Sequence, residues 1–343
     1  LILLTAVYQA SNWGGAVTAI TINTPGTPST AATAIDGFPM TQQGKAGRAL
    51  GISLVSSTVG GFIGVIIMIV FSRPLAVLSV KMHPAEYFAL AIFGLTTVAS
   101  LGGKNWAKAF VAALIGLLIN TIGIDPISGV RRYTFGETQL FDGFDFIPAL
   151  IGLFALSEVF SRLQEGRPKA LSEGRLGKEI WPSLRYYWKL KRPILISSVI
   201  GTVIGIFPGA GGSIASFLSY DAVKRTSRHP ETFGKGEPEG VAAAEAADNA
   251  SVGGAMVPLL TLGIPGSAST AVLIGALMIH ELVPGPMLFV ENAPLVYGLF
   301  ASMLLANVVM LGMGLLGARL WVKVTRIPGG VLITDPRAGK ILC

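Results

Sequence analysis

Charged side chains are scarce in this sequence, at 13% of its 343 residues, whereas a soluble domain carries roughly 25%. Long runs lack Asp, Glu, Lys and Arg altogether, among them 1–35, 193–220, 249–280 and 292–318. A helix needs about 20 mostly apolar residues to cross a bilayer, and a soluble chain would have too little polar surface to cover so many such runs. The scarcity of charge therefore predicts an all-α, polytopic membrane protein.

Cysteine and catalytic motifs are also missing. The single cysteine, Cys343, excludes a disulfide framework and a cysteine-ligated zinc site. Gly44-Lys45-Ala46 lacks the spacing and the hydroxyl residue of a Walker loop, and no His-Glu-x-x-His zinc motif occurs. We therefore expect no enzyme activity and no cofactor. The net charge of +7 comes from basic residues in loops, which favours a cytoplasmic membrane face over a nucleic-acid surface.

The uncharged runs give a map of candidate membrane helices: 1–22, 49–71, 85–101, 106–124, 146–162, 193–207, 242–262, 267–283 and 294–322. The connection 163–192 is strongly basic, so the positive-inside rule places it in the cytoplasm. We expect one half over 1–162, a second half over 193–326 and an atypical tail over 327–343. Because the chain begins inside an apolar segment without Met, we also expect it to be a fragment.

One uncharged run, 193–220, is interrupted by the segment Phe207-Pro208-Gly209-Ala210-Gly211-Gly212. Basic residues lie on both sides of this run, in 163–192 and again in 221–240. A single crossing would place these two basic stretches on opposite sides of the membrane. The charge pattern therefore favours a re-entrant hairpin, which returns the chain to the cytoplasm.

An internal repeat is the most informative feature. A shift of 240 residues places 10–31 on 250–271 without a gap, and ten of the 22 aligned positions are identical. The identical pairs are Ala10/Ala250, Ser11/Ser251, Gly14/Gly254, Val17/Val257, Thr21/Thr261, Pro25/Pro265, Gly26/Gly266, Ser29/Ser269, Thr30/Thr270 and Ala31/Ala271. Paired broken segments in two halves are typical of the binding site of a transporter.

Each copy of the repeat predicts a helix that begins in the middle of an uncharged run. Thr27 and Ser267 stand where an N-cap belongs, and Pro28 suits the first helical position. A helix N-terminus presents free N–H groups and a partial positive charge, which favour an anion. The alternative is a pair of ordinary surface turns. The predicted substrate-binding residues are Asn23, Thr24, Pro25, Gly26, Thr27, Ser29, Thr30, Pro208, Gly209, Gly211, Gly212, Asn249, Gly263, Pro265, Gly266, Ser267, Ser269 and Thr270.

Two carboxylates, Glu245 and Asp248, interrupt an otherwise apolar segment next to Asn249. They are three residues apart and so share one side of a helix, and ionisable groups inside a membrane are usually functional. We expect them to bind a coupling cation, Na⁺ or H⁺, while a solvated helix end at the membrane surface is the alternative. Asp36 is expected to cap a turn with Gly37. The pairs Gly60/Gly64 and Gly201/Gly205 have the spacing of close helix packing.

Ordered motifs along the chain resemble the large membrane subunit of tripartite tricarboxylate transporters, the TctA family. The residues that carry the resemblance are Gly14-Gly15, Asn23 to Thr27, Ala34 to Met40, Gly44 to Leu50, Phe207 to Gly211, Phe233 to Gly236, Glu239 to Ala242 and Leu260 to Ser267. The resemblance implies a secondary transporter of the bacterial inner membrane that imports citrate-like carboxylates on a sodium or proton gradient. It also implies two partners, a small membrane subunit and a periplasmic solute-binding protein. An ion channel and an intramembrane enzyme are the alternatives.

Overall fold

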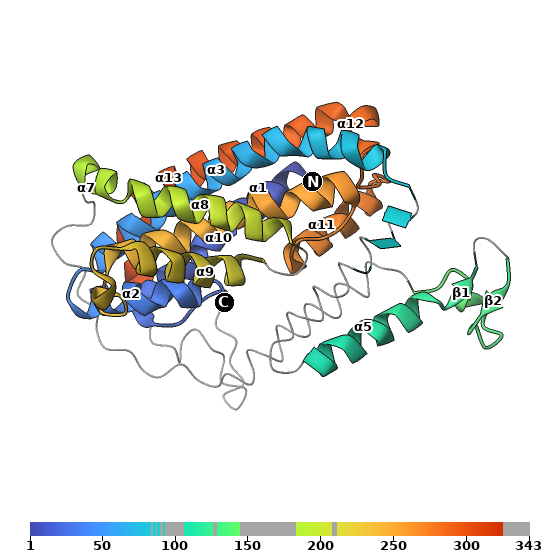
Figure 1. Ribbon diagram of the computed structural model, residues 1–343, viewed down its shortest axis with the longest axis horizontal. Helices are drawn as coiled ribbons and strands as arrows, with labels where there is room; N and C mark the ends of the chain where they lie inside the picture. The colour runs from blue at the N-terminus through green and yellow to red at the C-terminus, as the bar shows by residue number, and fades with distance from the viewer. Residues whose placement is uncertain are drawn as a thin grey trace.

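The computed structural model describes residues 1–83, 85, 86, 88, 89, 92, 106–125, 129–144, 183–207 and 211–324 (Figure 1). These residues form a helical bundle with one short β-ribbon, in which β1 pairs antiparallel with β2. The predicted all-α membrane architecture is confirmed. The elements are α1 (Ile2–Ile22), α2 (Thr30–Gln42), α3 (Ala46–Val80), α5 (Trp106–Asn120), β1 (Gly123–Ile124), β2 (Arg131–Arg132), η2 (Thr138–Leu140), α7 (Leu184–Lys189), α8 (Lys191–Ile206), α9 (Gly211–Thr226), η3 (Pro230–Thr232), α10 (Pro238–Leu262), α11 (Ala268–Ile279), α12 (Leu288–Glu291) and α13 (Ala293–Val324).

Seven of the nine predicted spans overlap these helices. The other two lie wholly (146–162) or mostly (85–101) outside the described residues. The predicted tail 327–343 and the residues Pro208 and Gly209 also lie outside them. By length and composition, Ala46–Val80 and Ala293–Gly317 are long and apolar enough to cross a membrane, and Phe110–Asn120 and Ser269–Ile279 are shorter apolar helices.

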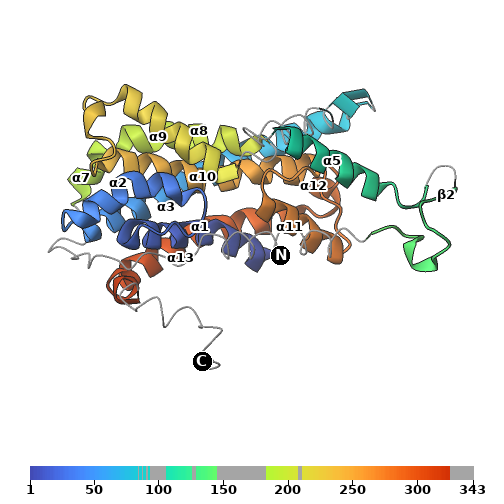
Figure 2. The same ribbon diagram turned by 90° about the horizontal axis from the view of Figure 1, so that it is seen from below.

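Helix α10 is the centre of the bundle. Figure 2 shows α8 and α9 on one side of it and α1 and α13 on the other. From Gly240 to Thr261 every residue of α10 is buried. Glycines let the neighbouring helices approach this closely: a Cβ on Gly64 would lie 2.5 Å from the carbonyl oxygen of Ala250, and one on Gly60 would collide with Ala246. On the other side Gly201 and Gly205 meet α10 in the same way, which confirms the close packing predicted for both glycine pairs.

The bundle has an apolar outside and a partly polar inside. On α8 the residues Leu195, Val199 and Val203 point outward and are exposed, whereas Ser197, Ser198 and Thr202 are buried against the bundle. The outer sides of α3 and α13 likewise expose Ile66, Val70, Leu305 and Val308. An apolar outer surface of this extent suits lipid and not water, and small hydroxyl residues at helix contacts are typical of membrane proteins.

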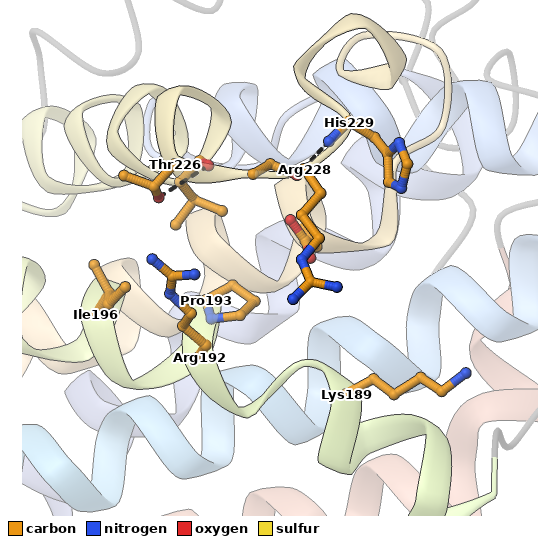
Figure 3. A pocket seen from close by; sticks show the side chains of 10 residues that line it. Lys189, Arg192, Pro193, Ile196, Thr226, Arg228 and His229 are labelled. Atoms are coloured by element: carbon orange, nitrogen blue, oxygen red, sulfur yellow. Dashed lines mark hydrogen bonds between the residues drawn. The ribbon is translucent and has the colours of Figure 1, made fainter.

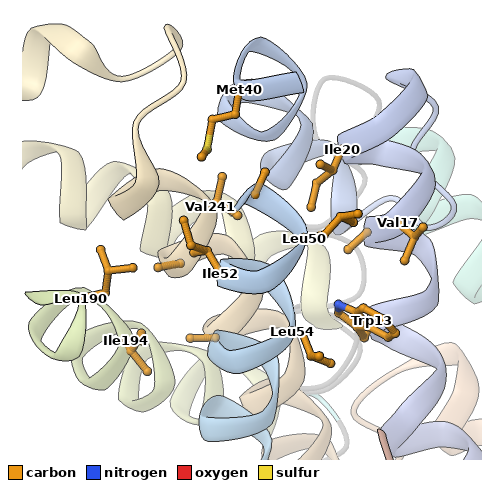
Figure 4. Close-up of a cluster of buried hydrophobic side chains, with 14 of the residues drawn as sticks. Trp13, Val17, Ile20, Met40, Leu50, Ile52, Leu54, Leu190, Ile194 and Val241 are labelled. Atoms are coloured by element: carbon orange, nitrogen blue, oxygen red, sulfur yellow. The ribbon is translucent and has the colours of Figure 1, made fainter. Parts of the chain in front are cut away.

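Helix direction can be read from pairs of contacts. Trp13 Nε1 of α1 donates to Ser53 Oγ of α3 at 3.1 Å, and the side chain of Gln9, one turn earlier, lies beside Gly61, two turns later. Helices α1 and α3 are therefore antiparallel. Around the first of these contacts, α1, α3, α8 and α10 share a core of buried apolar side chains (Figure 4).

Helix α10 runs in the opposite direction to α1. Gly60 and Gly64 of α3 meet Ala246 and Ala250 of α10 in the same order, so α3 and α10 are parallel, and α10 is antiparallel to α1. Since α1 and α10 are the helices related by the 240-residue repeat, the repeat is inverted. The third helices are exchanged between the copies: α3 packs on α10, and α13 packs on α1, where Thr5 Oγ1 lies 2.9 Å from Ser302 Oγ.

Helices α8 and α9 form a hairpin. Gly201 and Gly205 of α8 meet Ala247 and Ser251 of α10 in parallel order, whereas on α9 Gly212 lies against Asp248 and Ser216 Oγ donates to the carbonyl oxygen of Ala244, in antiparallel order. The chain therefore turns back after Phe207, and the start of α8 and the end of α9 lie at the same end of the bundle. The predicted hairpin is therefore present, whereas its return to the cytoplasm stays a prediction.

Candidate substrate and ion site

The two copies of the repeat begin their second helices with the same hydrogen bonds. In the second copy Ser267 is the N-cap of α11: its Oγ accepts from the N–H of Thr270, and Thr270 Oγ1 accepts from the N–H of Ser267 at 2.8 Å. In the first copy Thr30 Oγ1 accepts from the N–H of Thr27 at 3.3 Å. Thr30 Oγ1 and Thr270 Oγ1 each donate at 2.8 Å to the carbonyl oxygen three residues earlier.

One part of the prediction for these helix starts is wrong. Ser267 is an N-cap as expected, but α2 starts at Thr30, after Ser29, and not directly after Thr27. The reason is a tight first turn, in which the N–H of Thr30 donates to the carbonyl oxygen of Thr27 at 3.1 Å, three residues back. This turn carries Pro28, whose missing N–H costs nothing there.

The breaks before these helices are also alike. The C-cap residues Asn23, after α1, and Gly263, after α10, both adopt a left-handed backbone, with φ of 53° and 70°. After each break the chain folds back onto its own helix: a Cβ on Gly26 would lie 2.6 Å from Gly15 Cα, and one on Gly266 would lie 2.7 Å from Ala255 Cα. Gly15 and Ala255 are themselves repeat partners. Asn23 and Pro25 are exposed, whereas Thr24 and Pro265 are partly buried.

Each helix start is bound by the first helix of the other copy. Ser29 Oγ, at the start of α2, donates to Asp248 Oδ2 of α10 at 2.9 Å. Ser267 Oγ, at the start of α11, lies 2.9 Å from the hydroxyl of Tyr8 on α1. Tyr8 and Asp248 are 240 residues apart and so occupy equivalent positions. Asp248 is the eleventh residue of the 25 in α10, so α2 begins at about the middle of the longest buried helix.

The start of α9 lies against the same group. A Cβ on Gly212 would collide with Asp248 Oδ1, and one on Gly211 would lie 4.0 Å from Ser267 Cβ. Three helix starts therefore converge on Asp248 and Ser267. The predicted residues Pro208 and Gly209 lie outside the described residues. Ser269, although it is the repeat partner of Ser29, is exposed.

Glu245 lies one turn before Asp248 and is completely buried, with a relative exposure of 0%. Thr33 Oγ1 donates to one carboxylate oxygen at 2.5 Å and Ser57 Oγ to the other at 2.6 Å. Asp248 is also buried. The alternative of a solvated helix end is therefore wrong for both carboxylates, because α10 continues for two turns before Glu245 and neighbouring helices cover it on all sides.

Buried side-chain amides extend this polar region. Two of them, Gln9 and Asn307, were not predicted from the sequence. Gln9 Nε2 donates to Asn307 Oδ1 at 3.4 Å and to the backbone oxygen of Asn249 at 3.5 Å. Within the described part of the chain, Gln9 Oε1 and Asn249 Oδ1 are buried without a hydrogen-bond partner. The 240-residue shift pairs Gln9 with Asn249, so the repeat contained a signal for Gln9. Nothing in the sequence pointed to Asn307.

Asp36 has a structural role that the sequence analysis did not predict. It lies in the middle of α2, where its Oδ1 accepts hydrogen bonds of 2.8 Å from the N–H groups of Gly234, Gly236 and Glu237. Tyr220 donates to Oδ2 at 2.7 Å. The expectation of a turn cap with Gly37 is wrong, since α2 continues to Gln42. Asp36 instead holds the loop before α10 onto α2.

Comparison with known proteins gives one family match and two relatives. The sequence model of the tripartite tricarboxylate transporter TctA family matches residues 1–334. An uncharacterized 52.8 kDa protein in the TAR-I ttuC' 3' region of Agrobacterium vitis is 37% identical over 328 residues, 96% of this chain and 65% of that protein. An uncharacterized protein in the TAR-II ttuC' 3' region of the same organism is 40% identical over 128 residues, 37% of this chain and 53% of that protein. No solved structure matches the chain.

Proposed function

Because the chain belongs to the tripartite tricarboxylate transporter TctA family, we propose that it acts in the large permease subunit of a secondary-active uptake system. The proposed substrates are citrate-like carboxylates, and the proposed location is a bacterial inner membrane that the chain crosses several times. The proposed partners are a small membrane subunit and a periplasmic solute-binding protein. A gradient of Na⁺ or H⁺ would drive uptake.

The observation that carries this proposal is the position of two inverted helix starts beside the equivalent residues Asp248 and Tyr8, inside the bundle. The starts of α2 and α11 offer backbone N–H groups and the hydroxyls of Thr27, Ser29 and Ser267. Helix N-termini inside a membrane are the usual partners of anionic substrate groups in carriers built from inverted repeats. Two such ends suit a substrate with more than one carboxylate, and no arginine is needed.

Asp248 would link the binding of an ion to the binding of substrate. Its carboxylate accepts a hydrogen bond from the hydroxyl of Ser29, and a substrate carboxylate at the start of α2 would need the same donor. Two negative charges competing for one donor in a buried site repel each other. We therefore propose that a cation or proton neutralises Asp248 before the substrate carboxylate takes its place.

Ligands for such a cation lie close by. Glu245 is one helical turn from Asp248, and a buried carboxylate is costly unless a cation or proton neutralises it. The unpartnered oxygens Gln9 Oε1 and Asn249 Oδ1 are neutral oxygen donors of the kind that Na⁺ and other hard cations accept. These groups support the proposed role of Glu245 and Asp248 in ion coupling.

The test is uptake of labelled citrate by liposomes that carry the complete complex, with and without a Na⁺ or H⁺ gradient. We expect accumulation that follows the gradient. Asp248→Asn should abolish the dependence on the gradient while citrate still protects the protein from thermal unfolding, because the neutral side chain no longer repels the substrate. Ser11→Ala, on the exposed side of α1, is the control and should transport normally.

Three outcomes contradict the proposal. Saturable flow that ignores the gradient would indicate a channel, and conversion of citrate would indicate an enzyme. If Asp248→Asn accumulated citrate against a gradient as well as the unmodified protein does, Asp248 would have no part in coupling. In that last case the family assignment and the anion site would still stand.

A further inference from the structure

A cavity of about 280 Å³ lies at the end of the bundle where the α8–α9 hairpin starts and finishes (Figure 3). One wall comes from the junction of α7 and α8, and the other from the end of α9 and the residues that follow it. Its lining residues are Lys189, Arg192, Pro193, Ile196, Val223, Thr226, Ser227, Arg228, His229 and Glu239. The cavity is separate from the site around Asp248, because Val223 is about three helical turns of α9 away from Gly212.

The lining of this cavity is strongly basic. Lys189, Arg192 and Arg228 face only one carboxylate in the lining, Glu239. Among the described residues none of the three cations forms an ion pair, whereas His229 Nδ1 lies 3.6 Å from Glu231. Figure 3 shows Arg228 extending from the segment after α9 toward the first turn of α8, where Arg192 and Pro193 lie. Two guanidinium groups from separate segments therefore line one cavity.

The position of Arg192 at the start of α8 also favours a bound anion in the cavity. It lies in the first turn of α8, a helix of 16 residues, next to Lys191. The N-terminal turn of a helix already carries a partial positive charge, so cations there are unfavourable. No acidic residue lies in that turn. A bound anion would relieve both the repulsion between the arginines and the repulsion from the helix end.

The surroundings of the cavity are those of a membrane–water interface. Helix α7 carries three aromatic residues in a row, Tyr186, Tyr187 and Trp188, and Trp188 is 70% exposed with Lys191 Nζ 4.7 Å from its ring centre. The exposed apolar stripe of α8 begins at Leu195, one turn after Lys191. Aromatic and basic residues next to an apolar stripe mark the headgroup level of a bilayer.

We propose that this cavity binds the phosphate group of an anionic phospholipid. Arg192 and Arg228 would each donate two N–H groups to phosphate oxygens, the geometry that arginine favours, and the acyl chains would follow the apolar stripe of α8 into the bilayer. Basic pockets between helices on the cytoplasmic side are suited to such headgroups. The bound lipid would join the two ends of the α8–α9 hairpin, whose turn places Gly212 on Asp248.

The test compares lipids and variants on the purified full chain in detergent micelles. Thermal unfolding is measured with added phosphatidylglycerol, phosphatidylcholine or inorganic phosphate, and bound lipid is counted by native mass spectrometry. We expect phosphatidylglycerol alone to raise the melting temperature and to remain bound. In Arg192→Gln/Arg228→Gln we expect binding to weaken about tenfold or more, since two charge-assisted contacts are lost.

Arg225→Gln is the matched control, because Arg225 lies on α9 outside the cavity lining and pairs with Asp221 at 2.7 Å. It removes a positive charge from the same end of the bundle and should bind lipid as the unmodified chain does. Equal lipid binding by the double variant and the unmodified chain would overturn the proposal. So would an equal loss of binding in Arg225→Gln, which would show a diffuse charge effect. Stabilisation by inorganic phosphate to the same extent as by the lipid would indicate a site for free phosphate instead.

Discussion

Gly15 and Gly26 touch across the break between α1 and α2, with 2.6 Å between Gly15 Cα and the position that a Cβ on Gly26 would occupy. The contact recurs at Ala255 and Gly266 in the inverted copy, at 2.7 Å. Both contacts involve backbone, which cannot rotate away as a side chain can. They bring each helix start back onto its own preceding helix, about two turns before that helix ends.

Gly26→Ala and Gly266→Ala should therefore each destabilise the protein, by about 1–3 kcal/mol if the loop shifts to accommodate the methyl group. Thermal unfolding of the purified protein measures the loss. Gly14→Ala is the control: a Cβ there meets nothing within 4 Å, and alanine favours a helix over glycine by about 0.5–1 kcal/mol. Equal melting temperatures for Gly14→Ala and Gly26→Ala would contradict the contact.

Asp36→Ala should unfold the protein at a markedly lower temperature than Tyr220→Phe. The first variant leaves the N–H groups of Gly234, Gly236 and Glu237 without their acceptor, and hydrogen bonds to a charged group contribute about 1.5–3 kcal/mol each. Tyr220→Phe removes a single donor and should cost about 1–3 kcal/mol. Asp36→Asn keeps one carbonyl oxygen for the loop and should fall between them. The reverse order would show that Asp36 does not hold this loop.

An engineered disulfide tests the exchange of third helices between the two copies. Thr5→Cys/Ser302→Cys, with Cys343→Ser to remove the natural thiol, should form an intramolecular disulfide on mild oxidation, because the two replaced oxygens are 2.9 Å apart. Peptide mass spectrometry detects the bond. Leu3→Cys/Ser302→Cys is the control, since Leu3 is 74% exposed on the outside of α1, and it should stay reduced. A disulfide in the control alone would refute the packing of α13 on α1.

If Glu245 binds the coupling ion as proposed, Ser57→Ala should lower the ion concentration that gives half-maximal uptake. The variant removes the donor to Glu245 Oε2, so the buried carboxylate loses part of its stabilisation and should bind a proton or cation about tenfold more tightly. Thr58→Val is a matched control on the next residue, because Thr58 donates only to the backbone oxygen of Leu54. The same shift in both variants would indicate a general effect on α3.

The class of protein and the repeated break were predictable because they rest on local sequence. Runs without charge identify membrane helices directly, and Pro25-Gly26 and Pro265-Gly266 mark breaks wherever they occur. The direction of the two copies was not predictable, since a shift of 240 residues gives the same identities for parallel and inverted repeats. The contacts Trp13–Ser53 and Gln9–Gly61, which reveal the direction of α1 relative to α3, form only in the folded chain.

The partners of the polar side chains were also beyond prediction. Asp36 meets a loop 198 to 201 residues later, and Gln9 meets Asn307 across 298 residues. The sequence around either residue does not indicate a partner so far along the chain. Thr27 was assigned as an N-cap because its type suits that role, and the tighter turn that displaces the helix start to Thr30 depends on how the break packs against Gly15.

The exchange of helices between the copies has a consequence for biosynthesis. When the ribosome has completed α3, the glycine face formed by Gly60 and Gly64 and the hydroxyl of Ser57 have no partner, because α10 begins more than 150 residues later. The packing of α3 can therefore be completed only after α10 has been synthesised and inserted. Each copy depends on the other for part of its buried packing, so neither copy is a self-sufficient folding unit.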